Sequence, residues 1–165
     1  MARKLRGAEQ KLSDFLAEKT VVYLQKEVLE GRPASPGYWY PALSRYTAAV
    51  KGTDKIFGVR TGSLFHGIFK RRLQDGRYDV GIDHPAAKFI EFGHTYVRTW
   101  KQFLWMKYNY TAANGEQIRT PPAGKKVNVP PRPLLAPVIE RINRESEVYF
   151  DYFFGDLYNR SRGRA

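Results

Sequence analysis

The sequence predicts an α+β fold, with an antiparallel sheet of about four strands and long hairpins packed by N-terminal and C-terminal helices. Three observations carry this prediction. Apolar side chains recur at helical spacing near both ends of the chain, over residues 8–30 and 134–158. The middle, residues 53–133, holds short segments of strand character separated by glycine and proline turn signals. A length of 165 residues suits one domain, so residues 1–165 are treated as a single unit.

The first helix, residues 8–30, is expected because apolar positions alternate with lysine and glutamate at helical spacing. A glycine and a proline follow it closely and are typical of a helix end. The next loop, residues 31–41, contains Trp39 within an aromatic cluster that either folds back on the core or meets a partner. Residues 41–50 are expected to form a short helix opened by its proline.

A β-hairpin is predicted where Asp75 and Gly76 lie between two segments of strand character. Basic side chains on this hairpin are expected to project from the body of the domain: Lys70, Arg71, Arg72 and Arg77. A second short helix, residues 85–92, is predicted because Pro85 suits the first helical position and Gly93 suits a left-handed helix end.

The aromatic and basic residues 96–110 are interpreted as a half-buried strand, with stacking on nucleic-acid bases as the alternative. Asn114 and Gly115 form a second hairpin signal. The last helix is expected over residues 134–158, because its apolar residues share one face, and residues 159–165 are expected to be a frayed tail.

The net charge of +12 is concentrated in two blocks. Residues 45–77 hold eight Lys/Arg against two acids, and residues 93–132 hold seven against one, so each block carries a net charge of +6. Such blocks often face a polyanion, and a solvated surface is the alternative that charge alone leaves open.

Several classes of protein are disfavoured by composition. The chain has no cysteine, which excludes disulfides and thiolate chemistry. No apolar run approaches the ~20 residues of a membrane helix, and the basic N-terminal residues lack the apolar segment of a secretory signal. We therefore expect a protein of the cytoplasm with no membrane partner.

No pattern of catalytic or metal-binding residues stands out, and we expect no enzyme activity and no cofactor. His84, Glu91 and His94 lack the spacing of a zinc helix motif, and no cysteine completes a zinc set. Phosphate-binding glycine motifs are absent as well. A metal-dependent hydrolase that uses these three residues, and a small basic DNA- or RNA-binding module, remain as alternative hypotheses.

Three sequence anchors occur in a fixed order: RTGSLFHGI at residues 60–68, VGIDHPAAKFIEFGH at residues 80–94, and VPPRPLLAPVIERI at residues 129–142. Together they resemble the tail-completion and tail-terminator (virion morphogenesis) proteins of tailed bacteriophages. The pattern of that family runs T-G-x-L, then A-x-x-x-E-F-G, then P-x-R-P-F/L-L before a C-terminal helix. From the first anchor to the last, the match spans about half of the chain. Ser63 departs from the pattern, since the family often has Arg or Lys there, and the segment 94–128 is longer than expected.

The resemblance implies a structural virion protein of the phage neck, assembled in the host cytoplasm. Such a subunit forms a ring, usually hexameric, at the head-proximal end of the tail. The ring completes or terminates the tail tube and joins it to the head connector (stopper) protein, and genomic DNA passes through its lumen without sequence-specific contacts. The homo-oligomer, the tail tube protein and the connector protein are therefore the implied partners.

Carried onto this chain, the anchors imply structural roles. Thr61 and Gly62 turn the chain into the sheet, while Glu91, Phe92 and Gly93 end the short helix with Phe92 inward. Arg132 and Pro133 set the entry to the last helix, where Arg132 pairs with an acid of a neighbouring subunit or caps a carbonyl. The expected subunit interface comprises Trp39, Trp100, Trp105, Arg132, Phe150 and Phe153. The expected lumen or DNA-facing basic residues are Lys70, Arg71, Arg72, Arg77, Lys125 and Lys126.

Overall fold

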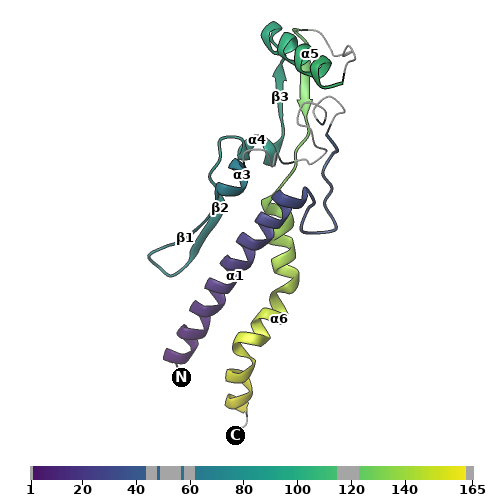
Figure 1. Ribbon diagram of the computed structural model, residues 1–165. Coiled ribbons are helices and arrows are strands. Elements are labelled where there is room, and N and C mark those ends of the chain that lie inside the picture. Colours follow the sequence, from purple (N-terminus) through teal and green to yellow (C-terminus); the bar gives the residue numbers. More distant parts are fainter. Residues whose placement is uncertain (1, 44–47, 49–56, 58–61, 115–122, 163–165) are drawn as a thin grey trace.

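A computed structural model of the chain describes residues 2–43, 48, 57, 62–114 and 123–162. Two long helices, α1 (Ala2–Glu30) and α6 (Leu135–Arg162), run antiparallel side by side, so both ends of the chain lie at one end of the molecule (Figure 1). The other side of α1 contacts a β-hairpin, which makes α1 the middle layer of the body. The predicted α+β class is confirmed.

The four described strands form two separate ribbons. Strand β1 (Ile68–Arg72) pairs antiparallel with β2 (Tyr78–Ile82), and β3 (His94–Val97) pairs antiparallel with β4 (Lys126–Val129). The expected single sheet of four strands is therefore not found in the described part of the chain. The β3–β4 ribbon instead rises from the body as an arm, and it carries α5 (Trp100–Asn114) at its far end (Figure 1).

The β1–β2 turn forms where Asp75 and Gly76 predicted it. Leu73 N–H donates to Arg77 O at 2.8 Å, and Gly76 adopts φ 83°, a conformation that glycine takes without steric cost. The hairpin lies along α1, because Lys70 Nζ binds Asp14 Oδ1 at 3.1 Å and Glu18 Oε2 at 2.7 Å, both on α1. Lys70 is exposed as expected, but these ion pairs turn its ammonium toward α1.

Helix α5 replaces most of the strand expected over residues 96–110. A capping box begins the helix, since Gln102 N–H donates to Thr99 Oγ1 at 3.2 Å and Thr99 N–H donates to Gln102 Oε1 at 2.9 Å. Only the first residues of the expected strand belong to β3. Asn114 is the last residue of α5 and not part of a hairpin, and Gly115 lies outside the described residues.

Helix boundaries differ from those expected. Helix α1 begins at Ala2 and continues through Gly7, since one interior glycine costs only about 1 kcal/mol. Helix α4 (Ala87–Phe92) begins two residues after Pro85, which lies in a turn before it. Helix α6 continues to Arg162 instead of ending in a tail at 159. The helix expected over residues 41–50 lies almost wholly outside the described residues.

The hydrophobic core is small and lies where the upper halves of α1 and α6 meet the short helix α3 (Ser63–His66). Its buried members are Tyr23, Leu24, Val28, Tyr40, Phe57, Leu64, Leu134 and Val138. Ile68, Val80 and Ile82 of the first hairpin pack against this cluster. The core thus joins the first hairpin, α3 and both long helices near one end of those helices.

We expect Leu24→Ala to lower the free energy of unfolding by about 2–5 kcal/mol, because Leu24 is fully buried and truncation leaves a cavity. Urea denaturation followed by circular dichroism measures this change. Leu29→Ala on the same helix is the matched control, since Leu29 is 45% exposed and should lose less than about 1 kcal/mol. Equal losses for both variants would contradict the placement of the core.

Candidate functional site

The second and third sequence anchors meet at one joint, formed by residues 90–93 at the end of α4 and residues 129–135 at the start of α6. Glu91 Oε2 accepts the N–H of Leu134 at 2.6 Å and the N–H of Leu135 at 3.3 Å. These amides lie at the N-terminal end of α6, where backbone N–H groups have no partner within the helix. The carboxylate also lies at the positive end of the helix dipole. Glu91 therefore acts as an N-cap supplied from another segment.

Loop residues complete the joint. Arg132 Nε and Nη2 donate to the carbonyl of Pro41 at 3.2 and 2.9 Å, and Arg132 N–H donates to Ile90 O at 2.7 Å. Tyr40 Oη donates to Pro133 O at 2.8 Å. Of the two roles expected for Arg132, the structure shows the contact with a carbonyl. The chain entering α6 is thus held from both sides.

Glycines adopt a positive φ at two of the anchors. Gly93 has φ 66°, and a Cβ there would lie 2.6 Å from Val129 O, so only glycine fits without a shift of the backbone. Gly62 has φ 61° at the start of α3, whose Leu64 is buried in the core beside Leu134. Thr61 lies outside the described residues. All three anchors therefore contribute to the joint and its adjoining core.

Phe92 does not point inward as expected, since its side chain is 74% exposed. Phe89 on the same short helix is 52% exposed. Helix α4 has only six residues and turns Ile90 toward the core, which leaves both phenylalanines on its outer side.

The histidines near this joint have structural contacts. His84 Nδ1 accepts the N–H of Ala86 at 3.1 Å, and the His94 ring contacts Phe89 and Tyr96 with centroids 5.2 and 5.8 Å apart. Within the described residues, no group of three or more His, Cys, Asp or Glu side chains is arranged to hold a metal ion. Glu91, the third member of the hydrolase hypothesis, is engaged at the start of α6.

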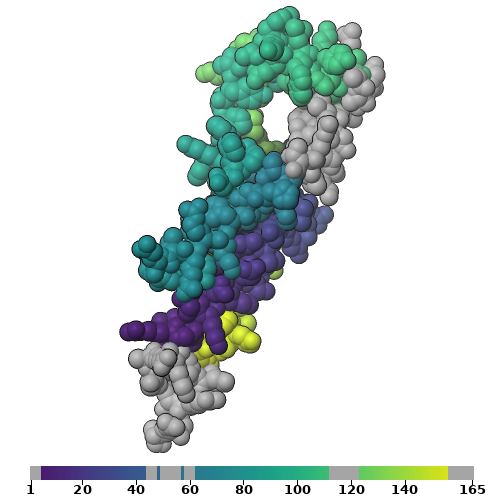
Figure 2. Space-filling view, turned by 60° about the vertical axis from the view of Figure 1, so that its left-hand side comes forward, coloured from purple at the N-terminus to yellow at the C-terminus, as the bar shows by residue number. Residues whose placement is uncertain are grey.

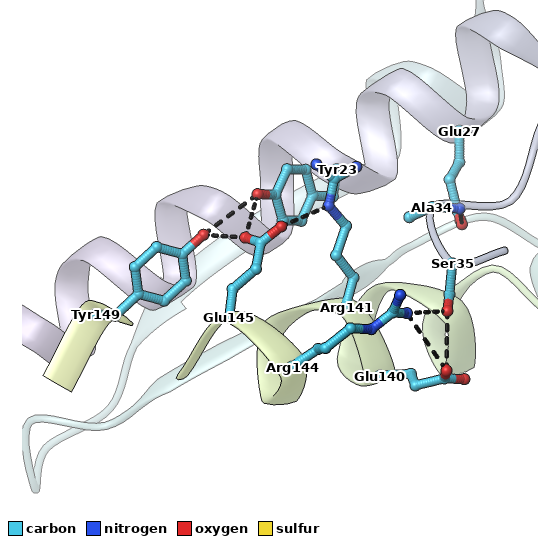
Figure 3. A network of polar contacts seen from close by, with 9 residues as sticks. All are labelled: Tyr23, Glu27, Ala34, Ser35, Glu140, Arg141, Arg144, Glu145 and Tyr149. Carbon is cyan, nitrogen blue, oxygen red and sulfur yellow. Dashed lines mark hydrogen bonds and ion pairs between the residues drawn. The ribbon is translucent and has the colours of Figure 1, made fainter. Parts of the chain in front are cut away.

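A polar network joins α1 to α6 (Figure 3). Glu145 is its centre, because Oε2 accepts the hydroxyls of Tyr23 at 2.6 Å and of Tyr149, while Oε1 accepts Arg141 Nε at 2.9 Å. Burial alone would raise the pKa of Glu145, but the hydrogen bonds from both tyrosines and Arg141 outweigh it and lower the pKa to about 2. Arg141 also lies 4.1 Å from the centroid of the Tyr23 ring. This network fixes the register of the two helices.

Glu27 is buried at the upper end of the same interface and accepts the N–H of Ala34 through Oε1. Its Oε2 has no hydrogen-bond partner within the described part of the chain. Burial raises the pKa of Glu27 from 4.5 to about 8, and the hydrogen bond from Ala34 opposes this only in part. Nearby, Ser35 Oγ donates to Glu140 Oε1 at 3.0 Å and accepts Arg144 Nη2 at 2.5 Å.

Most of the aromatic side chains expected at a subunit interface are exposed in the single chain. Trp39 is 75% exposed, Trp100 62%, Trp105 57% and Phe150 57%. Phe153 is partly buried, because its ring packs against Phe15 of α1 with centroids 5.4 Å apart. These residues do not form one patch. The two tryptophans are on α5, at one end of the molecule, whereas Phe150 and Phe153 are on the C-terminal half of α6, which runs toward the other end (Figure 1).

The basic residues expected to face DNA fall into two groups. Arg71 and Arg72 on β1 are exposed, and Arg77 pairs with Asp75 within the turn. Lys125 and Lys126 are exposed at the arm beside the start of β4. Figure 1 shows the two groups at different heights of the molecule, so they do not form a continuous basic surface within one chain.

One surface feature was not foreseen. A groove of about 460 Å³ lies between the N-terminal half of α1 and the C-terminal half of α6. Its lining includes Leu12, Leu16, Glu147, Tyr149, Phe150 and Asp151. The groove joins residues of α1 and α6 that are more than a hundred positions apart in the sequence. The only sequence signal that could have indicated it is the high aromatic content of the last helix. We call it the α1–α6 groove.

No protein-family model, curated protein or solved structure matches the chain. In the part of the chain that the structure describes, no helix combines the length and apolar character needed to cross a membrane.

We expect Glu91→Ala to lower the free energy of unfolding by about 1–3 kcal/mol, because it leaves amides at the start of α6 without a partner. Glu91→Gln keeps an acceptor oxygen and should lose less. Asp79→Ala, which removes an exposed carboxylate on β2, is the matched control and should change stability by less than about 0.5 kcal/mol. Denaturant titration measures all three, and a loss no larger than that of the control would refute the capping role.

The pKa of Glu27 predicts a pH dependence of stability. A raised pKa means that the folded state binds the proton more tightly, so this stabilisation is fully present below pH 4.5 and is lost as the pH rises to about 8. We expect Glu27→Gln to flatten the decline of the unfolding free energy between about pH 5 and about pH 8. Glu30→Gln, on the exposed side of the same turn, should keep the wild-type slope. Identical slopes for wild type and Glu27→Gln would contradict the assignment.

Proposed function

We propose that the chain is a non-enzymatic structural subunit of a tailed-phage neck. It assembles as a ring at the head-proximal end of the tail, with the six copies that the family resemblance implies. The ring terminates or completes the tail tube and docks the head connector protein. DNA crosses its lumen without sequence-specific contacts. The subunit is therefore a virion protein that is assembled in the host cytoplasm.

The observation that carries this proposal is the convergence of the three anchors. Glu91 of the E-F-G motif caps the helix that follows the P-x-R-P-L-L motif, and Leu64 of the T-G-x-L motif packs in the adjoining core. Residues that resemble a family pattern by chance would have no reason to contact one another across 40 or more positions of sequence. Their contacts support a shared structural purpose for the pattern.

Surface composition supports an assembling subunit. Among the described residues, sixteen large hydrophobic side chains are exposed and ten hydrophobic residues are buried. The exposed set includes tryptophan and tyrosine, which are enriched at the centres of protein interfaces. A chain with this balance gains stability when a partner covers the exposed rings.

Charge supports a lumen role without requiring tight DNA binding. Exposed arginines on β1 and lysines at the arm supply positive potential in two separate places. Several copies in a ring would repeat each group around an axis, so that one group surrounds the passing DNA. A compact DNA- or RNA-binding module would instead gather its basic residues on one face of a single chain.

The test is capping of tail tubes. Purified chain is mixed with tubes polymerised from the major tail protein of the same virion, and electron microscopy scores the tube ends. We expect rings at one end of each tube and an arrest of further polymerisation. Tubes that keep bare ends and continue to grow at saturating chain would refute the terminator role.

Binding of free duplex DNA provides the comparison with the nucleic-acid module. A lumen surface predicts weak, strongly salt-dependent binding without base preference. Nanomolar binding at physiological salt with a preferred sequence would favour the module and contradict the proposal.

A further inference from the structure

Two exposed surfaces of the chain complement each other in shape and charge. One is the outer face of α5, which we call the α5 face: Trp100, Lys101, Leu104, Trp105, Lys107 and Tyr108. The other is the α1–α6 groove. One surface is convex, aromatic and basic, while the other is hollow, largely apolar and acidic at its edge.

The α5 face is a stripe along the helix. Trp100, Leu104 and Tyr108 recur every four residues and therefore lie on one side, with Trp105 beside them. Tyr108 is 75% exposed, and both tryptophans are more than half exposed. The sequence of α5 contains two lysines and no acidic residue, so its charge is positive throughout.

The lining of the groove has the opposite charge. Glu147 and Asp151 line it, and both are exposed at its edge. No Lys or Arg is among the described residues that line it. Leu12, Leu16 and Phe150 supply the apolar lining.

Helix α5 cannot reach the groove of its own chain. Figures 1 and 2 show α5 at one end of an elongated molecule, while the groove lies between the halves of α1 and α6 that lead to the two termini at the other end. We propose that the α5 face of one copy docks into the α1–α6 groove of a second copy of this chain. Aromatic side chains fill the groove, and Lys101 and Lys107 face Glu147 and Asp151 across its edge.

The available area decides how strong one such contact is. The three exposed rings offer on the order of 300–500 Å² of surface. A stable interface buries about 800 Å² on each partner, so one contact alone binds weakly. Each copy carries one α5 face and one groove, so closure of a cycle gives every copy two contacts and stabilises the assembly cooperatively.

This inference names the subunit contact of the proposed ring and in that respect rests on the proposed function. A contact between two different surfaces propagates from copy to copy until the rotation closes. The same contact also closes two antiparallel copies as a dimer with two equivalent contacts, so the mass of the assembly tests the ring separately from the contact.

Charge reversal tests the contact directly. The α5 variant is Lys101→Glu with Lys107→Glu, and the groove variant is Glu147→Lys with Asp151→Lys. All four side chains are exposed, so folding should be retained. We expect each variant alone to self-associate at least about tenfold more weakly than wild type, because like charges then face each other. An equimolar mixture should recover the wild-type mass by alternating the two variants.

Analytical ultracentrifugation over a concentration series provides the readout. Lys26→Glu with Lys88→Glu is the matched control. It makes the same charge change as the α5 variant, but at exposed sites outside both surfaces, so it should assemble as wild type does. The contact is refuted if wild type stays monomeric, if the variants assemble normally, or if the mixture fails to recover. Monomers that bind anionic lipid vesicles through α5 would also refute it, in favour of a membrane surface.

Cross-linking gives a second, independent readout. The chain has no cysteine, so Tyr108→Cys with Ser146→Cys introduces only one designed pair, whose members lie too far apart to join within a chain. We expect oxidation to give covalent oligomers, whereas Lys88→Cys with Ser146→Cys should give none. A covalent dimer as the largest closed species would support the contact and contradict the ring. If the charge-reversal variants still form rings on tube ends as wild type does, the proposed contact is refuted while the proposed function stands.

Discussion

The hydrogen bonds from Leu134 and Leu135 to the Glu91 carboxylate are the interaction on which the arrangement of the chain depends. They join the end of α4 to the start of α6, and the β3–β4 arm leaves the body between these two segments. Pro137, in the first turn of α6, has no N–H to donate. The Glu91 carboxylate therefore accepts from the two amides that precede it, those of Leu134 and Leu135. Arg132 and Gly93 stabilise the same joint, because Arg132 binds the carbonyl of Pro41 and Gly93 lets the end of α4 approach Val129 closely. This joint therefore links the direction of the arm to that of the helical body.

The joint explains why aromatic residues are exposed where they are. The arm carries α5 away from the core, so its tryptophans are not covered by the rest of the described chain. At the other end, α1 and α6 leave a groove beside the Glu145 network, although Phe15 still contacts Tyr149 and Phe153 there. The proposed contact between copies would join these two different ends of the chain.

Local signals predicted local features. Asp75 and Gly76 require only a tight turn between strands, and a glycine ends α1 at Gly31, so neither depends on distant residues. Helix α5 was missed because its aromatic residues have high β-propensity, although the capping pair Thr99 and Gln102 was legible in the sequence. The division into two ribbons, the cap by Glu91 and the groove all depend on contacts between distant segments, which periodicity does not report.

The most direct test of the central claim is electron microscopy of the purified chain alone, at concentrations where its mass exceeds that of a monomer. We expect closed rings of uniform size with an open centre, in which each subunit contacts two neighbours through different surfaces. Particles that remain single elongated subunits, or that close as two-fold dimers without a lumen, would contradict it.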